Sequence, residues 1–167
     1  MTSPDAERAA TAPGLGKRLI SLWRTWHGRP FGPAIFSWMV GRMAPYSGTM
    51  GARVETLKPG FARLVLRDRR RVRNHLGSIH AIALANLGEL TSGLALMSAL
   101  PDGMRGILVG FSIEYLKKAR GTLRAESAAP IPADGVVRDY GVHVVIQDGE
   151  GDAVARGIAR WRIAPVK

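Results

Sequence analysis

A short polar loop followed by a long apolar segment carries the residues of this sequence that could do chemistry. The loop holds Asn74, Gly77 and His80, and the apolar segment that starts at Ala81 contains a single charged residue, Glu89. Burying a carboxylate is costly unless it is paired or neutralised, so this acid is a candidate general base or nucleophile. The alternative interpretation is structural, with Glu89 paired to an arginine or capping a structural group.

The start of the apolar segment offers a second chemical group. If Ala81–Leu100 is a helix, the backbone N–H groups of its first turn are unpaired and carry the positive end of the helix dipole. A carbonyl oxygen placed there would be polarised as in an oxyanion hole. Asn74 and His80 are close enough in sequence to hold a water molecule or orient a substrate. Ser92, one turn beyond Glu89, either helps to hold a water molecule or satisfies a backbone carbonyl.

Other kinds of site find less support in the sequence. His75 and His80 form a pair of metal-binding side chains, but no third ligand stands at a suitable spacing, so we predict no metal site. Ser112 does not lie in a Gly-x-Ser-x-Gly elbow. The sequence also lacks a glycine-rich loop of the kind that binds phosphate groups.

The elements that must position these residues are predicted from apolar periodicity. Helical spacing predicts a helix at Leu15–Trp26 and a shorter one at about Pro33–Met43. Alternation and turn residues predict six strands: Arg53–Lys58, Phe61–Asp68, Gly106–Tyr115, Gly121–Ala128, Val136–Gln147 and Ala153–Ile163. Helices and strands are segregated, which indicates an α+β fold. A helix that is apolar nearly all round must be covered on most sides, so we expect an antiparallel sheet wrapped around one long central helix.

Composition limits the class of protein and its partners. The chain has 167 residues, enough for one domain, and it has no cysteine, which fits a reducing compartment such as the cytoplasm. It carries 24 basic and 13 acidic residues, a net charge of +11, which predicts attraction to anions. Polar residues within Ala81–Leu100 favour a buried helix over a membrane span. The basic, tryptophan-bearing helices at the start suggest either contact with a membrane or acyl chain, or packing on the domain, which we prefer.

The polar loop and the acid resemble the signature of a known family. Asn74, Gly77 and His80, followed nine residues later by Glu89, resemble hotdog-fold acyl-CoA thioesterases of the phenylacetate-pathway and 4-hydroxybenzoyl-CoA types. The resemblance covers roughly residues 45–165 and includes the segment Tyr115–Gly121 and a last hairpin at 147–155. It implies a hotdog fold with extra N-terminal helices. We therefore expect a disordered lead-in at 1–14, helices packed on the domain at 15–45, and a hotdog domain at 46–167.

The resemblance also implies catalytic roles. The family's helix acid attacks the thioester carbonyl or activates water, and the backbone N–H after the histidine polarises the thioester oxygen. The implied catalytic residues here are Glu89, Asn74, His80, Ala81 and Ser92. The family usually has His-Gly-Gly where this chain has His-Ala-Ile, so a Cβ at Ala81 and a branched side chain at Ile82 crowd the thioester's approach. The alternative function is a non-catalytic protein of the same fold that binds an acyl thioester or a fatty acid.

The predicted substrate is an acyl-CoA or acyl-carrier thioester. Coenzyme A enters as part of the substrate, with no separate cofactor, and its phosphates are assigned to Gly77, Lys117, Lys118 and Arg120, with the arginine run at 67–73 as a second candidate. Ala81 and Glu89 are about 12 Å apart along one helix, so we predict an active site shared between two chains of a homodimer, which could pair further into a dimer of dimers. No nucleic-acid-binding module is found, and membrane contact is disfavoured.

Overall fold

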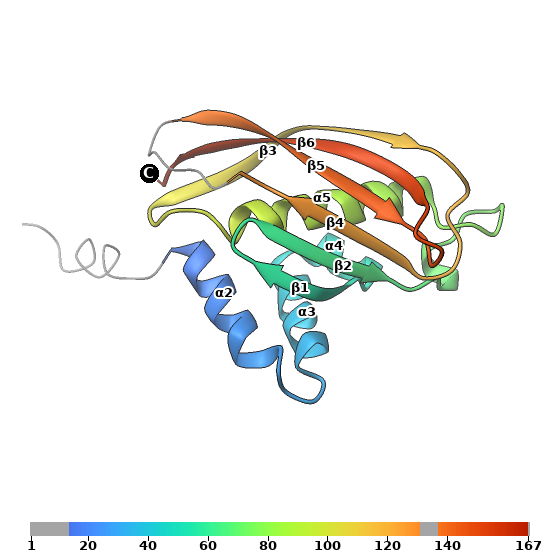
Figure 1. Ribbon diagram of the computed structural model, residues 1–167, viewed down its shortest axis with the longest axis horizontal. Helices are drawn as coiled ribbons and strands as arrows, with labels where there is room; N and C mark the ends of the chain where they lie inside the picture. Colours follow the sequence, from blue (N-terminus) through green and yellow to red (C-terminus); the bar gives the residue numbers. More distant parts are fainter. Residues whose placement is uncertain (1–13, 131–136, 167) are drawn as a thin grey trace, which may run out of the picture.

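A curved antiparallel sheet wraps around one long helix in the computed structural model, which describes residues 14–130 and 137–166 (Figure 1). The predicted lead-in at 1–14 lies outside the described residues, apart from Gly14. The helices are α2 (Leu15–Trp26), α3 (Gly32–Met43), α4 (Pro45–Met50) and α5 (Ala81–Met97), with a short 3-10 helix η1 (Arg70–Val72). The strands are β1 (Arg53–Lys58), β2 (Phe61–Leu66), β3 (Met104–Tyr115), β4 (Leu123–Ala128), β5 (Arg138–Gln147) and β6 (Ala153–Pro165).

The six strands form one sheet in the order β1-β2-β4-β5-β6-β3, and every neighbouring pair is antiparallel. β1 and β2 meet at the turn Pro59-Gly60, where Gly60 has the positive φ that the second central residue of a type II turn requires. β3 is an edge strand that pairs with β6 along its length, with one irregularity in register between Leu108 and Gly110. The long β3 therefore has one edge free of pairing within the described chain.

α5 is the element that the sheet encloses. Leu84, Leu87 and Leu94 are buried, and β2 and β4 are the strands that pack most extensively on the helix. Gly88 leaves room for the ring of Phe111, and Gly93 leaves room for Trp161, because a Cβ at either position would press on these rings. The helix is thus fixed between the two halves of the curved sheet.

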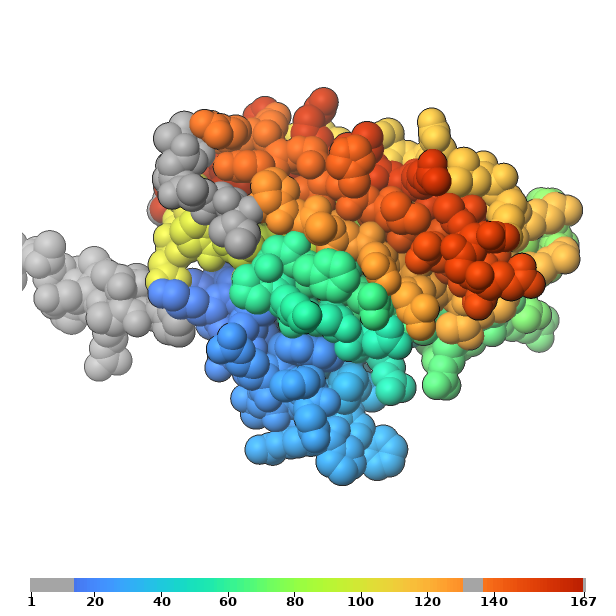
Figure 2. Space-filling view, in the orientation of Figure 1, coloured from blue at the N-terminus to red at the C-terminus, as the bar shows by residue number. Residues whose placement is uncertain are grey.

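The N-terminal helices share the core of the sheet. Leu19 and Trp23 of α2 and Phe36 of α3 are buried in the same apolar cluster as residues of β1, β2 and α5. The rings of Trp23 and Phe36 meet edge to face with centroids 5.1 Å apart. Figure 2 shows these two helices projecting beneath the sheet as a lobe of their own. They are continuous with the core and not a separate folding unit.

The prediction of an α+β fold with a sheet wrapped around a central helix is confirmed. The bounds of α2 and β1 are those predicted, α5 ends at Met97 instead of Leu100, and each of the other strands differs from prediction by two residues at one end. The predicted start of the fifth strand, Val136, lies outside the described residues. α4, which has only six residues, was not predicted. No helix of the described chain is long and apolar enough to cross a membrane.

Replacement of Phe36 by alanine tests whether the N-terminal helices belong to the core. Phe36 is fully buried, so we expect Phe36→Ala to lower the free energy of unfolding by about 3–5 kcal/mol. Phe31→Ala is the matched control, because Phe31 is 81% exposed and its loss should change stability by less than about 0.5 kcal/mol. Urea unfolding measures both values. Equal effects would contradict a shared core.

Candidate active site

The first turn of α5 is shaped by His80, which caps the helix. His80 has extended backbone angles, and its Nδ1 accepts a hydrogen bond of 3.0 Å from the backbone N–H of Ile82. A neutral ring that accepts at Nδ1 carries its proton on Nε2. The N–H of Ala81 donates to no acceptor within residues 14–130 and 137–166. The predicted oxyanion donor is therefore a free donor at the positive end of the α5 dipole.

The loop before α5 is organised by Asn74. Its Oδ1 accepts hydrogen bonds from the backbone N–H groups of Leu76 and Ser78 and from the Ser78 hydroxyl. Gly77 has a φ of 68°, a left-handed conformation that favours glycine. Thus the structure gives Asn74 and Gly77 a role in forming this loop, a role that the spacing of the motif alone did not reveal.

Tyr115, at the end of β3, was not predicted as a site residue. Its hydroxyl donates a hydrogen bond of 3.0 Å to the carbonyl oxygen of Ala81. Burial raises the pKa of this hydroxyl, so it stays a donor at neutral pH. From the sequence, Tyr115 was noted only as the first residue of the segment Tyr115–Gly121, which resembles the corresponding segment of the thioesterase family. Its contact ties the end of the edge strand β3 to the start of α5.

Glu89 lies in the middle of α5, half-buried, on the strip of the helix that the sheet leaves open. It is three residues from Asn86, whose Oδ1 accepts from Ser47 of α4, and three residues from Ser92, which faces Trp161 of β6. At 3.6 residues per turn, Glu89 therefore points between these two covered sides. Its carboxylate forms no hydrogen bond or ion pair with any residue that the structure describes, and burial raises its pKa. No arginine among the described residues pairs with Glu89, so the structure gives no support to a structural role through an arginine partner.

Ser92 takes the second of its two predicted roles. Its hydroxyl donates a hydrogen bond of 2.9 Å to the backbone carbonyl of Glu89, and it accepts from Trp161 Nε1 at 3.4 Å. The side chain is fully buried. Ser92 therefore satisfies a carbonyl and fixes the β6 contact, and it has no free access to a substrate water in this arrangement.

The predicted phosphate-binding residues divide into two groups. The ammonium of Lys117 lies 2.7 Å from carboxylate oxygens of both Asp148 and Asp152, and these partners raise its pKa. Lys117 thus closes the β5–β6 turn onto the segment that follows β3. Lys118 and Arg120 are exposed and form no ion pair with the described residues, so they remain available to an anion.

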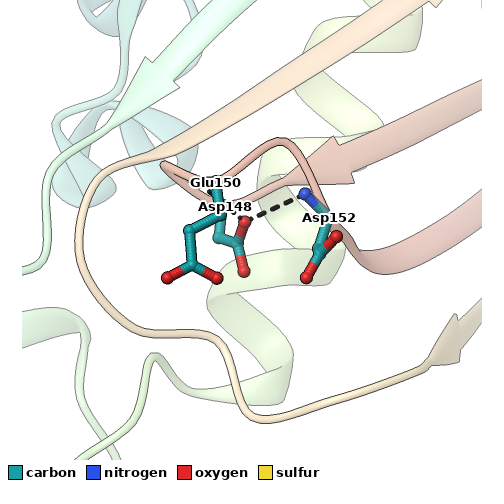
Figure 3. Close-up of side chains that lie close together, drawn as sticks. All are labelled: Asp148, Glu150 and Asp152. Carbon is teal, nitrogen blue, oxygen red and sulfur yellow. Dashed lines mark hydrogen bonds between the residues drawn. The ribbon is translucent and has the colours of Figure 1, made fainter.

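The β5–β6 turn gathers three carboxylates, those of Asp148, Glu150 and Asp152, within 4.8 Å of one another (Figure 3). Asp148 Oδ1 accepts from the backbone N–H groups of the other two residues, which is the bonding of a tight turn. The ammonium of Lys117 lowers the pKa of Asp148 and balances the cluster. A cation of the chain itself already occupies this place.

The pieces of the predicted site therefore converge only in part. The Asn74 loop, His80, the free Ala81 N–H and the 116–122 segment lie at one end of the molecule, where Ile79 N–H donates to Ala119 (Figure 1). Glu89 lies eight residues along α5, about 12 Å from Ala81.

Comparison with known proteins agrees with this architecture. A structural genomics protein of known crystal structure is 32% identical, covers 89% of this chain and 99% of its own, and superposes with a TM-score of 0.76. A protein of unknown function from Pseudomonas aeruginosa, described as a probable thioesterase, is 22% identical, with a TM-score of 0.71 and coverage of 83% and 97%. A thioesterase family protein from Silicibacter pomeroyi is 19% identical, with a TM-score of 0.64 and coverage of 78% and 96%. No curated protein sequence matches this chain.

These likenesses confirm the predicted hotdog fold, the fold of the thioesterases among the neighbours. The family model that matches residues 32–163 begins at the first residue of α3 and ends within β6, so it spans the second N-terminal helix together with the whole sheet. The chain thus belongs to the family described as a domain of unknown function, DUF4442, and has the hotdog fold.

Proposed function

We propose that this protein hydrolyses acyl thioesters, with acyl-CoA as the substrate class. The observation that carries the proposal is Glu89, a half-buried carboxylate without a partner among the described residues, in an otherwise apolar helix. Such a group weakens the fold because it is desolvated without compensation. Catalysis is the physical reason for keeping it, since a raised pKa suits a general base or nucleophile near neutral pH.

Two groups of the chain would share the chemistry. The Ala81 N–H, at the positive end of α5, polarises the thioester carbonyl and stabilises the negative charge that develops on its oxygen. Glu89 then acts by one of two routes. It takes a proton from a water molecule that attacks the carbonyl carbon, and the thiol leaves with that proton. Alternatively its own oxygen attacks, the thiolate leaves and takes up a proton from solvent, and water hydrolyses the resulting anhydride.

One chain does not bring these groups together. A nucleophile and an oxyanion donor must both reach one thioester within about 3 Å, yet they lie about 12 Å apart along α5. Pairing of the free β3 edge with a second copy would place two α5 helices side by side and antiparallel, Glu89 of one chain facing the Ala81 N–H of the other. A long unpaired edge strand favours such pairing, and exposed Ile107 on β3 supports it. The two-fold axis would give two equivalent sites.

Binding without cleavage is the second candidate function. Ile82 is 55% exposed beside the free Ala81 N–H, where it narrows the approach of a thioester. A steady-state assay that measures free thiol released from a panel of acyl-CoAs separates the two functions. Turnover supports hydrolysis, and saturable binding without turnover supports the second candidate.

The first prediction for this site concerns activity. Glu89→Gln keeps the shape of the side chain and removes the base, so we expect thioester hydrolysis to fall by a factor of about 10² or more. The matched control is Glu150→Gln, which makes the same substitution at an exposed acid in the β5–β6 turn. Wild-type turnover in Glu89→Gln would mean that Glu89 is structural.

The second prediction concerns stability and pH. Burial raises the pKa of Glu89 above its ordinary value of 4.5, so the folded chain holds this proton more tightly than the unfolded chain. Stability from this group is full below pH 4.5 and is lost as the pH rises through the folded pKa. We therefore expect Glu89→Gln to be more stable than wild type at neutral pH, and this difference to vanish below pH 4.5.

Urea unfolding of both proteins at acidic and neutral pH measures the difference. A variant that is less stable than wild type at neutral pH would show that the carboxylate has a stabilising partner. The same variant then separates the two roles: Glu89→Gln should lose stability if the acid is structural, and should lose activity while gaining stability if the acid is catalytic and unpartnered.

The third prediction tests the shared site by complementation. Ala81→Pro removes the N–H donor, and position 81 tolerates proline because it is the first residue of α5 and follows His80, whose φ of −64° and ψ of 140° suit a residue before proline. Mixed with Glu89→Ala chains and allowed to exchange, it should restore one working site per mixed dimer. Equal mixing should recover about a quarter of wild-type activity.

The control mixes Glu89→Ala with Glu89→Gln, in which no combination has an intact acid. Each variant alone should be inactive. A fully active monomer, or a mixture with no more activity than its components, would contradict a site built from two chains.

A further inference from the structure

A cavity that Glu89 does not line lies between the helices α3 and α4 and the first hairpin. Its volume is about 1160 Å³, and its walls come from α3, α4, the start of β1 and the end of β2. Leu90 of α5 lines it, whereas Glu89 does not. The Ser47–Asn86 hydrogen bond joins α4 to α5 on the side of Leu90 that faces Glu89. The cavity is thus distinct from the strip on which Glu89 lies.

One wall of this cavity is apolar. Trp38 of α3, Ala52 and Leu90 of α5 supply its accessible apolar surface. Val40, Val54 and Leu64 form the buried layer beneath them. The volume is that of a site for a small organic ligand, and it is far more than a single inorganic anion needs. This wall suits a hydrocarbon chain.

Another part of the cavity lining is strongly basic. It is lined by Arg42, Arg53, Arg67 and Arg69, with Glu55 as the single acid. The Glu55 carboxylate is already approached by two arginines of neighbouring strands, Arg124 at 3.4 Å and Arg63 at 4.0 Å. Arg53, Arg67 and Arg69 form no ion pair with any acid in the described part of the chain. This side therefore has cationic groups that lack anions.

Two guanidinium groups approach Gly51, which lines the cavity, and one of them, that of Arg69, lines the cavity as well. Gly51 ends α4 with a φ of 71°, and a Cβ built there would collide with Arg71 and lie 3.4 Å from Arg69 Nη1. Like charges at such proximity repel each other unless an anion lies between them. Asp68, the acid in this run, is bound 2.6 Å from Arg73 and also accepts from the Gly121 N–H. It is therefore unavailable to the two arginines.

We propose that this cavity binds a single-chain amphipathic anion, an alkyl carboxylate or an alkyl phosphate. The anionic head lies against Arg67 and Arg69, which form charge-assisted hydrogen bonds with it. The hydrocarbon tail lies along Trp38, Ala52 and Leu90. This site is additional to the proposed thioesterase site and does not rest on it, since no residue of the proposed catalytic machinery lines the cavity.

Isothermal titration calorimetry on the full chain tests the site with dodecanoate and dodecyl phosphate, each below its micelle concentration. Inorganic phosphate and dodecanol are the probes that carry only the head or only the tail. We expect one molecule of at least one amphiphile to bind per chain, more tightly than either partial probe. The preferred head group identifies the class of ligand. Binding of inorganic phosphate as tight as that of dodecyl phosphate would overturn the proposal.

Two variants locate the ligand. Arg67→Ala with Arg69→Ala should weaken amphiphile binding about tenfold or more. Ala34→Trp should abolish it by filling the cavity from an exposed position on α3, where the larger side chain does not disturb the core. Arg156→Ala with Arg160→Ala removes the same charge from the outer face of β6 and is the matched control.

Circular dichroism and urea unfolding confirm that each variant is folded. Equal weakening by the control pair would show that binding follows only the net charge, and unchanged binding in Ala34→Trp would place the ligand elsewhere. Either result overturns the proposal. Because binding is measured without a thioester substrate, failure of this site and failure of the proposed hydrolysis are distinguished.

Discussion

The need to cover α5 is the physical constraint on which the rest of this structure depends. The helix is apolar on nearly every side, and an apolar helix is stable in water only when other elements exclude water from it. β2 and β4 cover one side, β5, β6 and β3 a second, and α4 part of a third. What remains is a narrow strip that carries Ile82 and Glu89. The proposed chemistry thus lies on the part of α5 that the packing of the other elements leaves uncovered.

At Glu89, the residue type found on this uncovered strip lowers the stability of the fold. A helix that is otherwise apolar would gain from an apolar residue at this position, because the carboxylate is desolvated and has no partner in the described chain. Folded proteins tolerate such local conflicts mainly at sites where they serve a function. A second chain laid along β3 would bury the acid further and raise its pKa more, while supplying the donor that one helix cannot. Assembly and activity would then depend on the same strip.

The sequence predicted the fold well where the signal is local. Alternation in β2, the Pro59-Gly60 turn and the periodicity of α2 mark these elements in their own residues. Contacts between residues that are distant in the sequence could not be predicted from it. The pairing of β3 with β6, the capture of Lys117 by the β5–β6 turn and the role of Asn74 in its own loop all require the folded geometry. α4 was missed because six residues show no helical period. Glu89, the single charged residue of an apolar segment, and the helix start at Ala81 were predicted because composition and spacing alone indicate them.

The N-terminal helices explain why the chain needs more than the sheet and α5. α2 and α3 extend the core through Trp23 and Phe36, and α4 reaches α5 through the Ser47–Asn86 hydrogen bond. Helices joined by short turns cannot fill the whole space beside a curved sheet, so the same segment that completes the core also leaves a cavity against β1 and β2. The arginines of the run after β2 face this cavity with no acid free to neutralise them. Part of the net charge of +11 is therefore concentrated at this one cavity. A ligand with both a charged head and an apolar tail matches both the basic and the apolar residues of its lining.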